Sequence, residues 1–115
     1  MKNNKVFIVC RTDYKSWQLS CSNAERHVQT RDFYFENTDP YEDYHASQRF
    51  EAVSPRTILD GSEGRLKKWL KLRKAVRSCS YVYPVAGCED NRKCRSLMRF
   101  ARLTGRYIIY EEEPL

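Results

Sequence analysis

The last third of the chain most constrains the fold, because it predicts a strand, a tight turn, a helix and a second strand in close succession. The β-rich run 80–85 is followed by turn and capping residues at 86–91. Apolar residues then recur at helical spacing over 92–104, Gly105 ends this helix, and 106–110 is a second β-rich run. A strand, a helix and a strand joined in this way form a right-handed, parallel βαβ unit in nearly all proteins.

The first third predicts another strand and helix. The continuous apolar run 5–10 is typical of a strand buried on both faces of a parallel sheet. A helix is expected within 20–30, with Ser22 as its cap and Glu25 completing a capping box. The aromatic run 31–35 is either a second strand or a packing cluster.

The middle of the chain predicts a long loop, a short strand and a basic helix. Residues 37–47 are polar and acidic and indicate a loop, and 50–55 is a strand ended by Pro55. The helix is expected over 65–78, with Leu72 on the margin of an apolar stripe formed by Leu66, Trp69, Leu70, Val76 and Cys79. This order of elements predicts an α/β fold: a small three-layer, Rossmann-like domain with a mainly parallel sheet.

Length and composition favour one domain over residues 1–115, since folded domains commonly have about 100–150 residues. No run approaches the roughly 18 apolar residues of a membrane helix, and no signal peptide is recognisable, so we expect a cytoplasmic protein with no membrane partner. The five cysteines are an odd number without a CxxC pair. They are expected to be small buried thiols, with no disulfide framework, no metal site and no cofactor.

The charge is unevenly distributed along the chain, whose formal net charge is +6. Residues 1–61 hold eight basic and nine acidic residues, whereas residues 62–106 hold thirteen basic and three acidic ones. Such asymmetry indicates an anionic ligand or partner for the second half of the chain.

The second half also resembles the small Rossmann-like proteins of the nucleoside 2-deoxyribosyltransferase superfamily and the related DUF4406 proteins, which are common in phages. The positions that fall on the family pattern are Cys79, Ser80, Tyr81-Val82-Tyr83, Gly87-Cys88, Asn91, Lys93, Leu97, Ala101, Gly105 and Ile108-Ile109-Tyr110. Upstream, Val53-Ser54-Pro55 is similar to the family's Val-x-Asn-Pro segment. The resemblance implies a protein of the phage type, located in the host cytoplasm.

The departures from the family pattern carry the functional expectation. The positions of the family's three catalytic acids fall on Leu72, Ser80 and Leu97, and a family glycine falls on Lys93. Glycosyl transfer needs a nucleophile and a general acid. The resemblance therefore implies a non-catalytic, degenerate member, a pseudoenzyme.

We expect the remaining site to bind a nucleotide or phosphate ligand, as a sequestering or inhibitory factor. In open parallel sheets, ligands bind at the carboxyl ends of the strands, beside helix N-termini. The candidate ligand-binding residues at this edge are Arg11, Thr12, Asp13, Tyr14, Gly87, Asn91, Arg92 and Lys93. Arg92 and Lys93 oppose the dipole of their own helix, which an anion would compensate.

Two alternatives stay open, as does assembly into a homo-oligomer. The basic helix 65–77 is suited to bind nucleic acid or an acidic host protein through Lys67, Lys68, Lys71 and Lys74. A general acid–base enzyme is the other alternative, built from His27, His45, Asp39, Glu42 and Asp43, although their spacing defines no triad.

Overall fold

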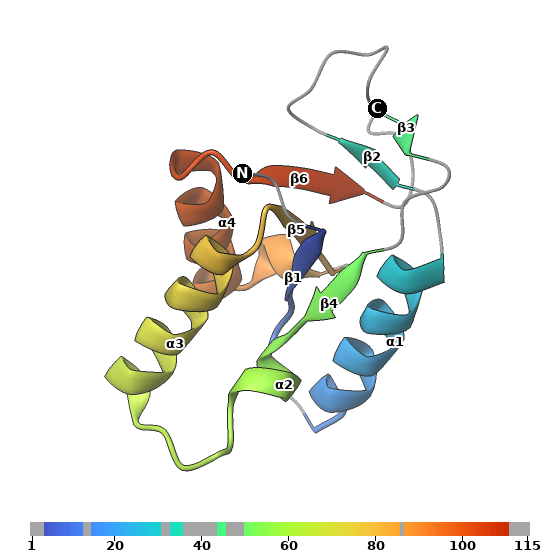
Figure 1. The fold of residues 1–115 in the computed structure, drawn as a ribbon. Helices are drawn as coiled ribbons and strands as arrows, with labels where there is room; N and C mark the ends of the chain where they lie inside the picture. The colour runs from blue at the N-terminus through green and yellow to red at the C-terminus, as the bar shows by residue number, and fades with distance from the viewer. Residues whose placement is uncertain are drawn as a thin grey trace.

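A six-stranded sheet in the order β3-β2-β6-β5-β1-β4 forms the middle layer of the molecule (Figure 1). The computed structural model describes residues 4–12, 15–30, 33–35, 44–45, 50–85 and 87–110. The elements along the chain are β1 (Lys5–Val9), α1 (Trp17–Thr30), β2 (Phe33–Phe35), β3 (Tyr44–His45), β4 (Glu51–Val53), α2 (Pro55–Ile58), α3 (Arg65–Ser78), β5 (Tyr81–Pro84), the 3-10 helix η1 (Cys88–Asp90), α4 (Arg92–Leu103) and β6 (Tyr107–Tyr110).

The predicted α/β fold with a mainly parallel sheet is confirmed. Strands β6, β5, β1 and β4 are parallel neighbours, whereas β2 is antiparallel to β6 and β3 is antiparallel to β2. Val82 of β5 lies opposite Phe7 of β1 and Ile108 of β6. The βαβ unit expected at the end of the chain is therefore present as β5-α4-β6.

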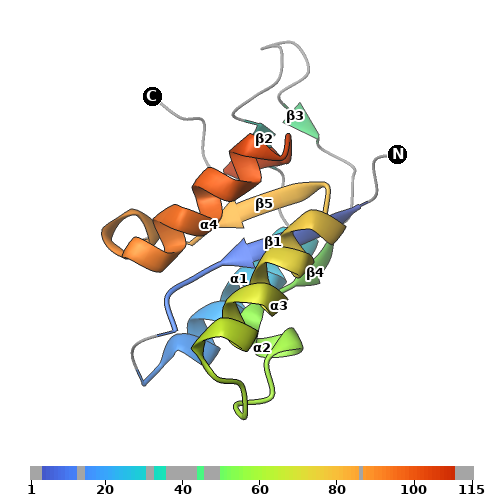
Figure 2. The same cartoon turned by 90° about the vertical axis from the view of Figure 1, so that its left-hand side faces the viewer.

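Helices cover both faces of this sheet, and the alternation of side chains along β1 explains why. Val6 and Ile8 pack with residues of α1, while Phe7 and Val9 pack on the opposite face with residues of α3 and α4. Figure 2 shows α3 and α4 side by side in front of the sheet, with α1 behind it. A strand that is apolar on both faces needs both helical layers, which makes the domain three-layered.

The predicted apolar stripe of α4 is also confirmed. Cys94, Leu97, Met98 and Ala101 are all buried. Gly105 follows the helix with a φ of +75°, a left-handed conformation that glycine adopts without strain.

The predicted stripe of α3 is wrong at Leu66 and Leu70, whereas Trp69 packs partly against the core and Val76 and Cys79 are buried. Leu66 and Leu70 are 71% and 55% exposed, whereas Leu72 is 7% exposed and packs in the core. The buried residues of α3 are Leu72, Ala75 and Val76, all in its second half. At 3.6 residues per turn, Leu70 lies roughly 160° around the helix from Leu72, so both cannot face the sheet.

The predicted cap of the first helix is wrong as well. α1 begins at Trp17, where the carbonyl of Ser16 accepts the N–H of Ser20, so Ser22 lies inside the helix and cannot cap it. Glu25 instead accepts two hydrogen bonds from Arg56, Nε–Oε2 at 2.9 Å and Nη2–Oε1 at 3.0 Å. This ion pair holds α1 against α2.

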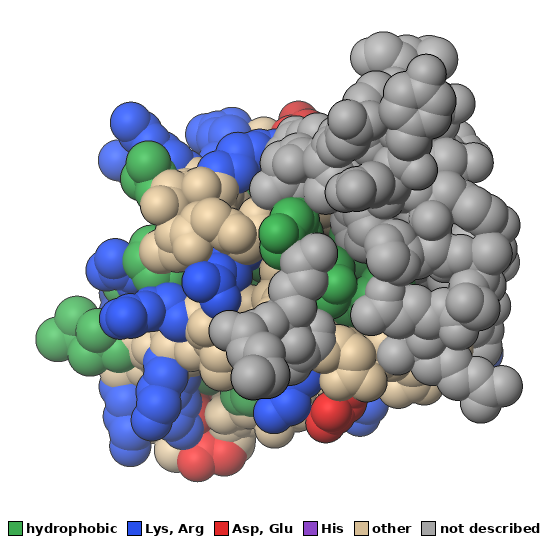
Figure 3. All heavy atoms as spheres, turned by 45° about the horizontal axis from the view of Figure 1, so that its top comes forward, with side chains coloured by type: hydrophobic (Ala, Val, Ile, Leu, Met, Phe, Trp, Pro, Cys, Tyr) green, Lys and Arg blue, Asp and Glu red, His purple; other side chains and the backbone are tan. Residues whose placement is uncertain are grey.

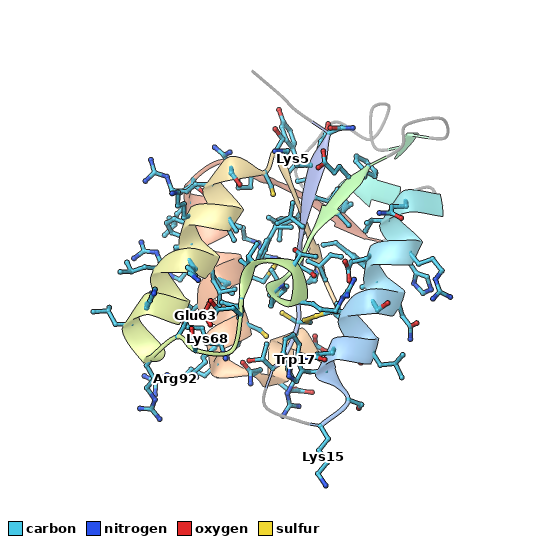
Figure 4. The ribbon with its side chains drawn as sticks, turned by 60° about the horizontal axis from the view of Figure 1, so that its bottom comes forward. Lys5, Lys15, Trp17, Glu63, Lys68 and Arg92 are labelled. Carbon is cyan, nitrogen blue, oxygen red and sulfur yellow. A yellow bond between two sulfur atoms is a disulfide. The ribbon has the colours of Figure 1, made fainter. Side chains whose placement is uncertain are left out.

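The cysteines differ in part from the expectation of free thiols. Cys10, directly after β1, and Cys21 of α1 form a disulfide (Figure 4), because α1 returns over the sheet beside the end of β1. Cys79, Cys88 and Cys94 are buried thiols that do not take part in this disulfide, as expected.

Two further expectations concern the middle of the chain and the membrane. Pro55 follows β4 as predicted, and it also begins α2. Part of the loop expected over 37–47 is the strand β3, and the rest lies outside the described residues. In the described part of the chain, no helix combines the length and apolar character needed to cross a membrane.

Candidate functional site

The candidate site lies where the connections of the parallel sheet leave toward opposite faces. The chain after β1 leads to α1 on one face, whereas the chains after β4 and β5 lead to α3 and α4 on the other. Such a switch point at the carboxyl ends of the strands is the usual ligand crevice of an open α/β sheet. The predicted position of the site therefore coincides with a structural feature of the fold.

A cleft of about 600 Å³ opens at this point. Four cations line it, two from each of two neighbouring helices: Arg65 and Lys68 from α3, Arg92 and Lys93 from α4. In Figure 4, Lys68 and Arg92 lie at the end of the molecule opposite Lys5, which begins β1. Among the described residues that line the cleft, none is Asp, Glu or His.

Most of the remaining wall is apolar. Leu72 and Leu97 lie one to two helical turns beyond the cations of their helices, and the indole of Trp69 is half-buried beside them. Cys10, Pro55 and Cys94 complete the apolar lining. A cavity with an apolar lining and a few polar groups is typical of small-molecule sites, which commonly enclose about 300–1,000 Å³.

The start of α4 is fixed by its cap. Asn91 has extended backbone angles, and its Oδ1 accepts the N–H of Cys94 at 3.0 Å. This bond satisfies one of the first N–H groups of the helix and leaves those of Arg92 and Lys93 at the cleft for other acceptors. Gly87 precedes η1 as its N-cap with a φ of +89°, a left-handed conformation that glycine adopts without strain.

The start of α3 is fixed by an ordered acidic loop. The side chain of Glu63 is 2% exposed and accepts N–H groups of Asp60 and Gly61, each at 3.0 Å, and Nζ of Lys71 at 2.6 Å. These interactions, led by the Lys71 bond, lower the pKa of Glu63 to about 2. Glu63 is thus engaged with the loop and with Lys71 of α3, and it is not among the residues that line the cleft.

Lys68 connects the two sides of the cleft. Its Nζ donates to Oγ1 of Thr12 at 3.1 Å and ties α3 to the chain that follows β1. Lys68 also lines a second cavity of about 200 Å³, together with Trp17 and Glu63 (Figure 4). Because the Thr12 hydroxyl carries no charge, this hydrogen bond does not offset the positive charge that Lys68 brings to the cleft.

The thiol of Cys88, just before α4, is not activated as a nucleophile. A hydrogen bond with Cys94, together with burial, raises the pKa of the Cys88 thiol. A thiol is nucleophilic only as the thiolate. Cys88 is therefore protonated and unsuited to covalent catalysis.

The structure brings together half of the predicted ligand-binding residues. Thr12, Asn91, Arg92 and Lys93 line the cleft. Neither Arg11, at the end of β1, nor Gly87 is among the lining residues, and Asp13 and Tyr14 lie outside the described residues.

Of the positions expected to replace catalytic acids, two reach the cleft. Leu72 and Leu97 line it and are 7% and 4% exposed. Ser80 is buried just before β5, at the amino end of that strand and thus at the opposite edge of the sheet. For the acid–base alternative, Asp39, Glu42 and Asp43 lie outside the described residues, and no metal-binding group of His, Cys, Asp and Glu is found among the residues described.

The sequence did not single out Arg65 or Trp69 for the cleft, and it assigned Lys68 to a partner surface. Arg65 and Lys68 precede Leu72 by seven and four residues, so they continue its line along α3. Once Leu72 is known to face the core, this spacing places both cations at the cleft. The spacing of these two cations was visible in the sequence, but it indicates the cleft only when the side of α3 that faces the core is known.

The four lysines predicted to bind a partner divide into two groups. Lys68 and Lys71 are half-buried and bonded within the molecule, whereas Lys67 and Lys74 are exposed on α3. Figure 3 shows that basic side chains outnumber acidic ones on the side formed by α3 and α4. The exposed Leu66 and Leu70 belong to this helix as well.

Comparison of the chain with protein-family models, with curated proteins and with solved structures finds no match. The resemblance to the deoxyribosyltransferase-like proteins therefore stays a prediction.

Proposed function

We propose that the protein binds a nucleotide or a related phosphate ligand in the cleft between α3 and α4, without catalysing its conversion. The observation that carries this proposal is the composition of the wall: four cations and, among the described lining residues, no carboxylate. Like charges gathered in a cleft repel one another, and an anion relieves this repulsion. The first-turn position of Arg92 and Lys93 adds to it, because cations there oppose the helix dipole.

The non-catalytic part of the proposal rests on the residues that face the ligand space. Leu72 and Leu97 line the cleft at positions where the deoxyribosyltransferase-like proteins have acids. Neither side chain can attack a sugar carbon or transfer a proton. A degenerate deoxyribosyltransferase-like protein of the phage type that sequesters a nucleotide fits this combination.

The test is a thermal-shift screen against nucleotides, cyclic nucleotides and ADP-ribose derivatives. A ligand that binds only the folded protein raises the free energy of unfolding by RT ln(1 + [L]/Kd). The double variant Arg92→Glu and Lys93→Glu should abolish the shift. Because acidic residues in the first turn favour a helix, this variant should still fold.

The matched control reverses two charges outside the cleft. Lys67→Glu with Lys74→Glu changes the net charge equally on exposed positions of α3 and should retain the shift. A shift that survives in the cleft variant would place the site elsewhere. Cleavage of nucleosides by the wild-type protein would contradict the non-catalytic assignment.

A second candidate function, docking of an acidic protein on α3, is favoured by its exposed leucines. Leu66 and Leu70 are one turn apart among basic residues, a spacing typical of helices that insert into an apolar groove. Nucleic acid would not need these leucines. Binding of an acidic, leucine-rich peptide that is lost in Leu66→Ser with Leu70→Ser supports docking; duplex DNA binding that both substitutions leave unchanged points to nucleic acid.

A further inference from the structure

We infer that the ligand of the cleft is a nucleoside diphosphate, bound through its phosphates without a divalent cation. This inference rests on the proposed function and specifies its ligand. It follows from three properties of the cleft: how many cations line it, how they are divided between the helices, and what the rest of the wall offers.

The number of cations sets the charge of the ligand. Four positive side chains line the cleft, and no carboxylate is found in the described part of its wall. A phosphate monoester carries about −1.5 to −2 charges near neutral pH, so it would leave about two cations uncompensated. A diphosphate adds a further negative charge and matches the wall more closely.

The division of the cations sets the shape of the anion. Arg65 and Lys68 come from α3, whereas Arg92 and Lys93 come from the neighbouring α4. Packed helices have axes about 8–10 Å apart, so the two pairs approach the ligand from different sides. Two linked phosphates give each pair its own set of acceptor oxygens, and arginine binds such oxygens through two parallel hydrogen bonds.

The apolar wall requires more than phosphate. Trp69, Leu72 and Leu97 line the cleft below the cations. A bare diphosphate would leave this surface and much of the roughly 600 Å³ volume to water. A nucleoside supplies an apolar, planar group that an indole can stack against, as aromatic side chains do with bases.

The same wall argues against a bound Mg²⁺. Proteins hold Mg²⁺ at phosphates through one or two carboxylates, and the described wall offers none. Here the cationic side chains do the neutralising. Mg²⁺ bound to the diphosphate would therefore compete with the four cations and weaken binding.

The experiment is isothermal titration with adenosine, AMP, ADP and pyrophosphate, and with the uridine series, in EDTA and then in Mg²⁺. One additional set of charge-assisted hydrogen bonds should give ADP or UDP about a tenfold or larger advantage over its monophosphate. Mg²⁺ should lower the affinity for the diphosphate, and pyrophosphate should bind more weakly than the nucleoside diphosphate.

Variants separate the two helices. Arg65→Ala should remove most of the advantage of the diphosphate over the monophosphate, whereas Lys67→Ala, at an exposed position of α3 that does not line the cleft, should leave it unchanged. Equal affinities for mono- and diphosphate, or tighter binding in Mg²⁺, would overturn the inference while the proposed function stands. Absence of binding by every phosphate compound would overturn both.

Discussion

α3 and α4 are neighbouring helices with similar composition, yet only one of them follows the hydrophobic pattern along its whole length. Neither helix contains an acidic residue, and both begin at the carboxyl edge of the sheet beside the cleft. In α4 every predicted core position is buried. In α3, Leu66 and Leu70 of the predicted stripe are exposed, although they are as apolar as Leu72, which is buried in the core in their place.

The difference comes from what each helix covers. The buried residues of α4 begin in its first turn at Cys94, whereas those of α3 begin only at Leu72 in its second half. The first half of α3 contributes Arg65 and Lys68 to the cleft, and Trp69 of this half packs only partly against the core. An apolar residue of a helix is buried only where another element lies opposite it, and the half of α3 without fully buried residues supplies Arg65 and Lys68 to the cleft.

The largest expected effect on stability comes from a comparison of two leucines of α3, one buried and one exposed. Leu72→Ala should lower the free energy of unfolding by about 2–5 kcal/mol, because it removes a buried side chain and leaves a cavity. Leu70→Ala, the matched control, should change it by less than about 0.5 kcal/mol, because that side chain is already exposed. Urea denaturation measures both. A larger loss for Leu70→Ala would show that the two sides of α3 are exchanged.

The next effect concerns the different caps of the two helices. Asn91→Ala should destabilise the protein by about 0.5–2 kcal/mol, because the N–H of Cys94 loses its acceptor. Asn91→Asp retains an acceptor oxygen and should restore most of the loss. Chemical denaturation of the three proteins tests this, and equal stability of all three would mean that the cap does not stabilise α4.

The stabilisation that Glu63 contributes in the loop before α3 should depend on pH. The pKa of Glu63 is lowered to about 2 in the folded protein, whereas an unperturbed glutamate titrates near about 4.3. Between these values the unfolded state binds the proton first, so the stabilisation is complete above about pH 4.3 and is lost as the pH falls toward 2.

The measurement is the urea midpoint of the wild type and of Glu63→Gln across this acid range. The variant should be less stable near neutral pH, and the difference between the two proteins should shrink on acidification. A difference that is independent of pH would show that the carboxylate of Glu63 is not the stabilising group.

The smallest effect is a gain. Gly64 is the N-cap of α3, has a φ of −72°, and an added Cβ there would meet no atom within 4 Å. Gly64→Ser supplies the missing side-chain acceptor and should raise the free energy of unfolding by a few tenths of a kcal/mol. Thermal denaturation checks this, and a loss of stability would mean that the loop before α3 does not tolerate the side chain.

Most of the fold could be predicted because it follows from local signals. Each element could be recognised from its own residue pattern, as with the apolar run that forms β1 and the strand, helix and strand at the end of the chain. The start of α1 was missed because Ser22, a good capping residue, competes with an earlier turn in which Ser16 accepts the first helical N–H. The pairing of Cys10 with Cys21 was missed because it depends on how α1 returns over the sheet.

The candidate site could be predicted only in part. Its edge of the sheet, and Asn91, Arg92 and Lys93, followed from the parallel βαβ unit. Arg65 and Trp69 did not, because their place depends on which side of α3 faces the core.

The sequence by itself determined the parallel α/β architecture, the amphipathic side of α4 and the excess of positive charge in the second half. These properties follow from period, turn chemistry and composition, each of which acts within a few residues. Only the tertiary structure decided that two cations of α3 meet two of α4 at one cleft, while Lys67 and Lys74 face outward. The reason is that the direction of a helical side chain is fixed by the contacts of the whole helix, and the fully buried residues of α3 all lie in its second half, so hydrophobicity alone does not reveal its orientation.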